Sequence, residues 1–192
     1  MSNKEKRMRV ISGKCRGTKL SAPEGVETRP TIDRIKETLF NMIAFDIPGC
    51  RFLDLFSGSG AIGIESLSRG AKRAVFVEKN TQAIACIRQN LAKTNLSDQA
   101  LLYTVDVDQA IHQLIQKKDV FDIIFLDPPY ALKEIEALLI KISQSSLLEK
   151  KGYIILEHGT QYPLKAVEGL RLIKEKKYKT TTISFFERTE ES

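Results

Sequence analysis

About two thirds of the way along the chain lies the run Phe121-Asp122-Ile123-Ile124-Phe125-Leu126-Asp127-Pro128-Pro129-Tyr130. Residues 121–126 are almost wholly apolar, which predicts a buried central β-strand. The two prolines cannot donate hydrogen bonds to a sheet, so the strand must end where they begin. We therefore expect Asp127 and Tyr130 to project from a rigid corner at the carboxyl edge of a sheet, where open α/β sheets bind their ligands.

Strand and helix patterns alternate along most of the chain. We expect strands at 51–56, 74–77, 101–105, 121–126, 153–156, 170–178 and 180–187, and helices at 31–45, 61–69, 81–95, 109–117 and 133–143. Thr31 is the expected N-cap of the first helix. The alternation indicates an α/β fold with a mostly parallel, doubly wound sheet of seven strands. The last two strands, with almost no residues between them, should close this sheet as an antiparallel hairpin.

Length and composition exclude several classes of protein. A chain of 192 residues with 42% apolar content predicts a single domain, residues 1–192. No apolar run approaches the ~18 residues of a membrane span, and the start of the chain lacks the apolar segment of a secretory signal. The cysteines, at positions 15, 50 and 86, have neither disulfide nor metal spacing. We therefore expect a cytoplasmic protein with no metal ion and no membrane attachment.

Basic residues are concentrated at the amino terminus. Residues 1–20 contain seven Lys and Arg side chains and a single Glu, which accounts for the whole formal net charge of +6. The runs 8–12 and 16–20 have strand character and flank Gly13-Lys14-Cys15, so they predict a β-hairpin with basic side chains on one face. A basic arm of this kind, residues 1–27, is the electrostatic signature of a polyanion partner.

A glycine-rich segment connects the first expected strand to the next helix. Gly58, Gly60 and Gly63 follow the pattern G-x-G-x-x-G, in which glycines let the backbone turn tightly and approach a ligand. Glu78 ends the following strand, 20 residues after Gly58, which is the distance at which a carboxylate meets ribose hydroxyls. These features alone fit several nucleotide-binding enzymes, an NAD-dependent oxidoreductase among them.

Acidic residues stand at the ends of other expected strands. Asp106 follows the third strand, with Asp108 as a close competitor for the same role. Asp54 precedes the glycine-rich segment, where it either supports the loop or contacts a ligand. Glu157 ends the fifth strand and either lines the cleft or is ordinary strand-end polarity. Because the carboxyl ends of parallel strands meet at one edge of a sheet, we expect the strand-end acids and Asp127 to surround one cleft.

The corner at Asp127 suits a flat heterocycle that carries an exocyclic amine. The Asp127 carboxylate and the free carbonyl of Pro128 are adjacent acceptors for an NH2 group, and Tyr130 can stack on the ring. Such an amine is a poor nucleophile because its lone pair is delocalised into the ring. Acceptors for both N–H groups can turn the nitrogen toward an electrophile and stabilise the charge that it gains.

The motif Asp127-Pro128-Pro129-Tyr130 resembles the (D/N)PP(Y/F) signature of S-adenosylmethionine-dependent amino-methyltransferases. Residues 8–17, 29–34, 39–41 and 54–60 precede it in that order. Together these segments resemble the RsmD family, bacterial methyltransferases that modify the N2 amine of a guanine in small-subunit (16S) ribosomal RNA. The resemblance covers essentially the whole chain past residue 7, and the hairpin and the Arg29-Pro30-Thr31 helix start are its most specific parts.

The resemblance implies a class I methyltransferase with a Rossmann-like core, residues 28–192, and S-adenosylmethionine as the cofactor. The ribose would lie on Glu78, and the adenine near Asp106 and Val107. The implied cofactor-binding residues are Arg29, Phe56, Ser57, Gly58, Gly60, Glu78, Asp106 and Val107, and the implied catalytic residues are Asp127, Pro128 and Tyr130. The target guanine would turn out of its stack, and RNA phosphates would bind Arg9, Lys14, Arg16 and Arg34. Ser57 is a small departure, because alanine is common there in the family.

Several other functions fit parts of the sequence. A DNA methyltransferase acting on N6 of adenine or N4 of cytosine shares the proline motif, but it usually carries a sizeable target-recognition domain, for which this chain has no insertion. Protein-glutamine methyltransferases typically begin the motif with Asn. An NAD-dependent oxidoreductase has no use for the motif, and a non-catalytic RNA-binding module has no need of the strand-end acids. His112 and His158 fit surface or structural roles. The expected partner is ribosomal RNA or the assembling small ribosomal subunit, bound by a monomer.

Overall fold

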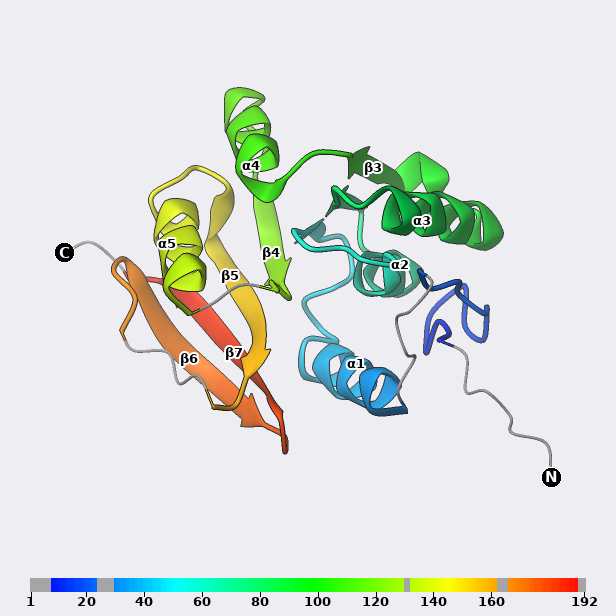
Figure 1. The fold of residues 1–192 in the computed structure, drawn as a ribbon, viewed down its shortest axis with the longest axis horizontal. Helices are drawn as coiled ribbons and strands as arrows, with labels where there is room; N and C mark the ends of the chain where they lie inside the picture. The colour runs from blue at the N-terminus through cyan, green and yellow to red at the C-terminus, as the bar shows by residue number, and fades with distance from the viewer. Residues whose placement is uncertain (1–7, 24–29, 130–131, 162–165, 190–192) are drawn as a thin grey trace. The chain divides into compact units, whose positions relative to one another are not determined.

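The computed structural model describes residues 8–23, 30–129, 132–161 and 166–189, and within them the side chains of all but 30–33 and 132–133. The chain forms two compact units, residues 1–106 and 107–192 (Figure 1). The domain limits expected from the sequence, 1–27 for the arm and 28–192 for the core, stay predictions. In the described residues, no helix combines the length and the apolarity needed to cross a membrane.

The first unit alternates helices with parallel strands. Its elements are α1 (Pro30–Met42), β1 (Arg51–Asp54), α2 (Ala61–Ser68), β2 (Arg73–Val77), α3 (Thr81–Thr94), the short 3-10 helix η1 (Ser97–Gln99) and β3 (Ala100–Tyr103). The strands are hydrogen-bonded in the order β3-β2-β1. Leu53 pairs with Val75, and Phe76 pairs with Leu102. The central strand β2 is buried from Ala74 onward, as expected of a parallel strand between two neighbours.

Helix α1 begins one residue earlier than the sequence analysis placed it. Pro30 is its first residue, a position that suits proline because the missing N–H has no partner in the first turn anyway. Thr31 therefore lies inside the helix, and its assignment as the N-cap was wrong. The helix ends at Met42 rather than at 45, and the Phe45 side chain beyond it is fully exposed.

The second unit contains the apolar strand that precedes the proline motif and the closing hairpin. Its elements are α4 (Val107–Gln116), β4 (Phe121–Leu126), α5 (Leu132–Ser143), β5 (Leu148–Gly159), β6 (Leu170–Lys177) and β7 (Thr181–Arg188). The strand order is β4-β5-β7-β6. Strands β4 and β5 are parallel, whereas β7 runs antiparallel to both β5 and β6. The expected α/β class, with seven strands of which the last is reversed, is confirmed.

The amino-terminal hairpin forms, but its paired part is short. An isolated antiparallel bridge pairs Arg9 with Lys19, and the backbone N–H of Leu20 donates to the carbonyl of Met8 at 2.8 Å. The side chains of Met8, Val10 and Leu20 are buried, whereas Arg9 and Lys19 are exposed. The alternation therefore places basic side chains on the solvent side of the arm, as the sequence predicts.

Candidate cofactor and catalytic site

The glycine-rich segment is a tight loop between β1 and α2. Gly58 and Gly60 have φ angles of 51° and 79°, a left-handed backbone that favours glycine. The Ser57 N–H donates to the carbonyl of Val77 at 3.0 Å, and the Ser57 Oγ accepts from the Val77 N–H at 3.0 Å. The same hydroxyl donates to the carbonyl of Asp54 at 2.9 Å. Ser57 therefore connects the loop to the end of β2 twice, and alanine would keep the backbone contact but lose the one made by the hydroxyl.

Glu78 completes this loop from the end of β2. Its Oε2 accepts from the N–H of Gly58 at 2.9 Å, and its Oε1 accepts from the N–H groups of Lys79 and Asn80 at 2.9 and 2.8 Å. The side chain is half-buried. Because a carboxylate offers about four lone-pair sites, Glu78 can hold the loop and still accept from ligand hydroxyls. The structure thus brings Glu78 and the glycine loop together, as the sequence predicts, and its ribose contact stays a prediction.

Asp54, the last residue of β1, stabilises the end of the glycine-rich segment. Its side chain is 1% exposed, and its Oδ2 accepts from the N–H of Gly63 at 3.2 Å, in the first turn of α2. Gly63 is needed there because an added Cβ would lie 2.3 Å from the Phe76 ring. Of the two roles that the sequence left open for Asp54, the geometry favours the structural one.

The two residues predicted to lie near the adenine, Asp106 and Val107, come after β3. Asp106 is half-buried, and Val107, the first residue of α4, is 7% exposed. The competitor Asp108 is exposed and pairs with Lys141, with an N–O distance of 2.5 Å. Asp108 therefore has an ion-pair partner on the surface, and the contact of Asp106 with adenine stays a prediction.

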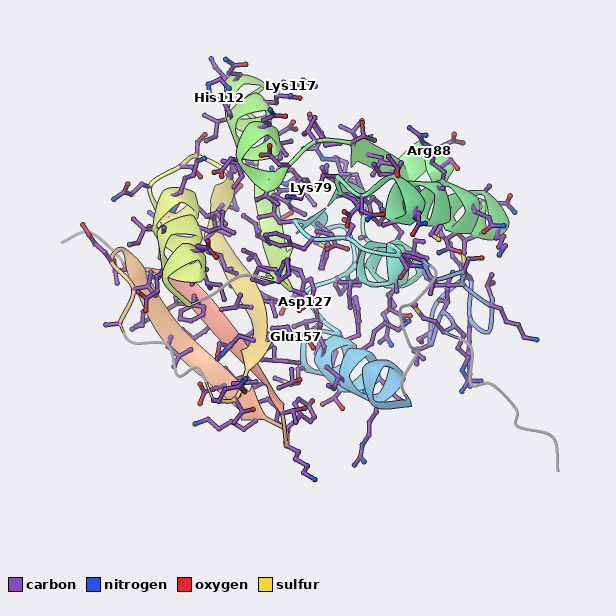
Figure 2. The ribbon with its side chains drawn as sticks, viewed as in Figure 1. Lys79, Arg88, His112, Lys117, Asp127 and Glu157 are labelled. Carbon is purple, nitrogen blue, oxygen red and sulfur yellow. The ribbon has the colours of Figure 1, made fainter. Side chains whose placement is uncertain are left out.

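Strands β4 and β5 place two carboxyl groups side by side. Leu126 pairs with Leu156 in parallel register, so Asp127 and Glu157 are the next residues of two strands that lie ~4.8 Å apart. Asp127 follows the last residue of β4, whereas Glu157 lies within β5, which continues to Gly159, and both residues are labelled in Figure 2. Asp127 is exposed, and Glu157 and Pro128 are half-buried. Glu157, which the sequence left undecided, is therefore a direct neighbour of the proposed catalytic acid.

Both carboxyl groups ionise less readily than usual. Desolvation raises the pKa of Asp127 to about 6. Desolvation and, to a smaller extent, the charge of Asp127 raise the pKa of Glu157 to about 8. Water reaches the exposed Asp127 side chain, which agrees with its smaller shift. At neutral pH, Asp127 is therefore mainly an acceptor, while Glu157 keeps its proton.

Glu157→Gln should flatten the pH dependence of stability. The pKa of Glu157 is raised from 4.5 to about 8 in the fold, so its stabilising effect is fully present below pH 4.5 and is lost as pH rises through 8. Wild type should lose free energy of unfolding between pH 6 and 8.5, and the variant should lose less. Urea unfolding followed by circular dichroism measures this difference. The exposed acid Glu168, changed to Gln, is the matched control and should keep the wild-type slope. Equal slopes for wild type and Glu157→Gln would contradict the shift.

The two histidines have the roles expected of them. His112 is exposed on α4 (Figure 2). His158 is 8% exposed on β5, and its Nε2 lies 2.8 Å from the Oγ of Ser184 on the neighbouring strand β7. The surface and structural roles predicted for these residues are confirmed. Among the described residues, no group of three or more His, Cys, Asp or Glu is arranged to hold a metal ion.

The remaining candidate residues divide into two sets. Arg29 and Tyr130 lie outside the described residues. The proposed RNA contacts are all exposed, on the arm for three of them and on α1 for the fourth: Arg9, Lys14, Arg16 and Arg34. On the arm, the Nζ of Lys14 donates to the Oε1 of Gln99 at 2.6 Å, a contact between segments far apart in the sequence.

Sequence reasoning missed one buried acid, Glu65 on α2, which contacts the basic arm. A carboxylate within the largely apolar run Ala61–Ser68 was the available signal. The periodicity of a short helix that is buried on nearly all sides does not show which partner such a residue has.

The comparisons with known proteins identify the family of the chain. A family model described as "Conserved hypothetical protein 95" matches residues 8–187. "Putative rRNA methyltransferase YlbH" of Bacillus subtilis is 40% identical over 94% of this chain and 99% of its own length. "Ribosomal RNA small subunit methyltransferase D" of Haemophilus influenzae is 33% identical over 91% and 90%. The solved structure "Putative methyltransferase yhhF from Escherichia coli" is 29% identical, with a TM-score of 0.83 over 96% of this chain and 99% of that one. The chain belongs to the family described as conserved hypothetical protein 95, the RsmD family of ribosomal RNA methyltransferases.

Proposed function

We propose that this protein transfers a methyl group from S-adenosylmethionine to the exocyclic N2 amine of a guanine in small-subunit (16S) ribosomal RNA. One observation carries the proposal: an exposed carboxylate, Asp127, followed by two prolines, ends a buried parallel strand in a chain of this family. Relatives named as small-subunit ribosomal RNA methyltransferases support the choice of substrate.

The residues of the first unit fit a nucleoside cofactor. Gly58 is half-buried with open space where a Cβ would lie, and Glu78 offers carboxylate oxygens beside it. Gly60 is buried and shapes the turn. Hydroxyls of a ribose would donate to Glu78, and Asp106 would accept from the adenine amine. When bound, S-adenosylmethionine supplies an electrophilic methyl group on a sulfonium sulfur.

The residues of the proline motif would prepare the nucleophile. The ionised Asp127 carboxylate and the Pro128 carbonyl accept the two N–H bonds of the guanine N2 amine, and Tyr130 stacks on the base. With both N–H bonds held in this way, the N2 lone pair would face the methyl group, and the carbon–sulfur bond would break as the carbon–nitrogen bond forms. The proton that the nitrogen then loses would pass to the Asp127 carboxylate that accepts it, so the product amine would be neutral. With its pKa raised to about 6, Asp127 is still mainly ionised at neutral pH, and it is protonated in weaker acid than an ordinary aspartate.

The basic arm would hold the RNA backbone. Arg9, Lys14 and Arg16 are exposed on the arm, and Arg34 is exposed on α1. Arginine and lysine on phosphates give affinity without reading sequence. The protein would act in the cytoplasm as a monomer, on ribosomal RNA or on the assembling small subunit.

Replacing Arg9, Lys14 and Arg16 with alanine together should weaken RNA binding and flatten its salt dependence. Each lost phosphate contact lowers the slope of log K against log salt by about 0.7 to 0.9. Fluorescence anisotropy of a labelled ribosomal RNA fragment, titrated at salt concentrations from about 50 to about 200 mM, measures the slope. The matched control replaces Lys117, Lys150 and Lys151, exposed cations of the second unit, with alanine. An unchanged slope in the arm variant would mean that the arm is not the RNA contact.

Transfer of tritium from labelled S-adenosylmethionine tests the whole proposal. The acceptors are unmethylated 16S ribosomal RNA, small-subunit particles assembled from it, and duplex DNA. Nucleoside analysis of the labelled product should give N2-methylguanosine. N6-methyladenine or N4-methylcytosine in DNA would refute the proposal and support a DNA methyltransferase. Calorimetric titration with S-adenosylhomocysteine and with NAD separates a methyltransferase from an oxidoreductase.

A further inference from the structure

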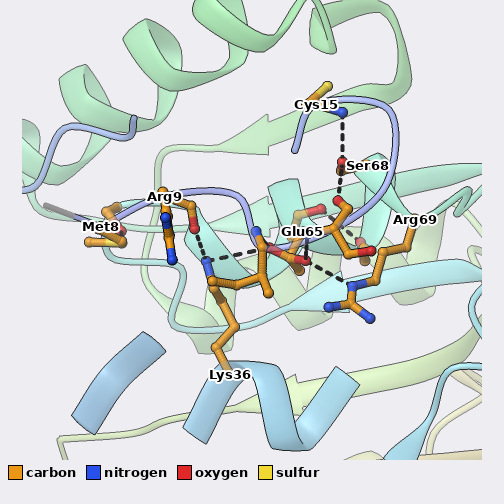
Figure 3. Close-up of polar contacts among 12 residues, drawn as sticks. Met8, Arg9, Cys15, Lys36, Glu65, Ser68 and Arg69 are labelled. Atoms are coloured by element: carbon orange, nitrogen blue, oxygen red, sulfur yellow. Dashed lines mark hydrogen bonds and ion pairs between the residues drawn. The ribbon is translucent and has the colours of Figure 1, made fainter. Parts of the chain in front are cut away.

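A buried carboxylate fastens the basic arm to the first unit. Glu65 on α2 is 0% exposed. Its Oε2 accepts from the backbone N–H of Ile11 at 2.8 Å, and its Oε1 accepts from the N–H of Ser12 at 2.9 Å. Figure 3 shows the carboxylate at the centre of a polar cluster that joins the arm to α1 and α2. Glu65 thus fixes arm backbone more than fifty residues away in the sequence.

Two cations balance the buried charge. The Nζ of Lys36 on α1, 2% exposed, lies 3.4 Å from Oε2, and the Nε of Arg69 donates to Oε1 at 2.8 Å. Lys36 also donates to the carbonyl of Arg9 at 2.6 Å, so it contacts both Glu65 and the arm. A buried charge without such partners would cost several kcal/mol. The arm backbone is therefore part of what makes this carboxylate tolerable in the core.

Ser68, one turn after Glu65, makes a second attachment. Its Oγ donates to the carbonyl of Ser12 at 2.6 Å and accepts from the N–H of Cys15 at 3.0 Å. Between these residues Gly13 has a φ of 84°, and an added Cβ would lie 1.9 Å from the Ser68 carbonyl oxygen. Backbone therefore meets backbone here, and only glycine fits.

The result is an arm whose backbone is fixed over residues 9–15 and whose basic side chains are exposed. Residues 9–15 are fastened by Glu65, Lys36 and Ser68, while the Arg9, Lys14 and Arg16 side chains remain exposed. Long basic side chains lose less freedom on binding when their backbone is already ordered. An arm held in one position therefore presents its cations to a polyanion in one arrangement.

We propose that Glu65 is a positioning residue for the RNA substrate. It contacts no RNA itself and acts through the Ile11 and Ser12 amides, which set the direction of the arm's cations. This inference rests on the RNA-binding part of the proposed function. A purely structural role would change cofactor binding as well, whereas a positioning role changes the affinity for RNA and leaves the affinity for the cofactor unchanged.

Two variants test the inference. Glu65→Gln removes the charge and keeps one carbonyl acceptor for the two amides. The double variant Glu65→Met with Lys36→Met removes the carboxylate and its fully buried lysine partner at similar volume, while Arg69, 12% exposed, keeps access to water. The amide acceptors are lost without leaving a lysine charge unpaired in the core. Val75→Ala is the control: this core residue of β2 is 1% exposed, and its truncation lowers stability away from the arm.

Three measurements are made on each protein. Hydrogen exchange followed by NMR reports the Ile11 and Ser12 amides, anisotropy gives the Kd for a 16S ribosomal RNA fragment, and calorimetry gives the Kd for S-adenosylhomocysteine. The double variant should exchange both amides at least about tenfold faster, because their acceptors are lost, and Glu65→Gln should lie between the double variant and wild type. The RNA Kd should rise about tenfold, because the entropy cost of ordering the arm then opposes RNA binding. The Kd for S-adenosylhomocysteine should stay within about twofold, and the control should keep both Kd values.

Each outcome decides between the alternatives. Faster amide exchange with an unchanged RNA Kd in the double variant overturns the positioning role, and so does a wild-type protein that does not bind the RNA. A Glu65-dependent RNA Kd in a protein that transfers no methyl group supports the positioning role and refutes the proposed reaction. The methyl-transfer assay on wild type therefore separates failure of the proposed function from failure of this inference.

Discussion

Asp127→Ala should lower methyl transfer about a hundredfold or more while cofactor binding is retained. Positioned groups that stabilise developing charge are worth about this much when a single one is removed. Asp127 is exposed at the end of β4, so its truncation creates no core cavity and the fold should persist. The loop that would hold the cofactor lies in the other compact unit, between β1 and α2. Tritium transfer gives kcat, and titration with S-adenosylhomocysteine gives the cofactor Kd.

Two further substitutions serve as controls for Asp127→Ala. Asp127→Asn keeps one carbonyl acceptor and should retain part of the activity. Asp108→Ala removes another exposed acid of the same unit, the one that pairs with Lys141, and should leave kcat unchanged. Near-normal turnover by Asp127→Ala would show that this carboxylate does not hold the target amine.

Glu78→Ala should raise the Kd for S-adenosylhomocysteine about ten- to a hundredfold. Hydrogen bonds to a charged group contribute about 1.5–3 kcal/mol each, and about 1.4 kcal/mol is a tenfold change in Kd. The variant removes the proposed ribose acceptor and also the acceptor for the N–H of Gly58, so the loop loses a contact that shapes it. Calorimetry measures the Kd, and activity at saturating cofactor should recover in part.

Two further substitutions serve as controls for Glu78→Ala. Glu78→Gln keeps one carbonyl oxygen and should lie between alanine and wild type. Lys79→Ala changes the adjacent exposed residue and should leave the Kd unchanged. If Glu78→Ala binds within about twofold of wild type, the ribose does not lie on this carboxylate.

The sheet could be predicted from the sequence because strand burial leaves a local signal. The apolar run ending at Leu126 gave β4 with the bounds that the structure has. Glu78 and the glycine loop could be predicted for the same reason, since strand, loop and helix follow one another in the chain. The beginning of β5 at Leu148 could not be predicted, because Glu149, Lys150 and Lys151 make that part of the strand polar. Its pairing with Phe121 depends on a register shift, which residue types do not encode locally.

The contacts of buried acids were beyond prediction for a different reason. Glu65 binds amides of Ile11 and Ser12, which belong to the arm, and no periodicity within α2 indicates such a distant partner. Glu157 became informative only when the Leu126–Leu156 register placed it beside Asp127. Thr31 was misassigned because a capping side chain and a proline at the first helical position compete as start signals, and here the proline decides.

Strand β6 lies at one end of the strand order and pairs with β7. Its side chains Leu172 and Ile173 are 48% and 46% exposed, so the strand combines apolar surface with backbone groups on its outer edge. Such an edge invites another chain to add a strand and begin an aggregate. The exposed lysines Lys174, Lys176 and Lys177 follow directly, and burying their charges against a second copy would be costly. The charges of these lysines therefore oppose edge-to-edge pairing of β6 with another copy of the chain at high protein concentration.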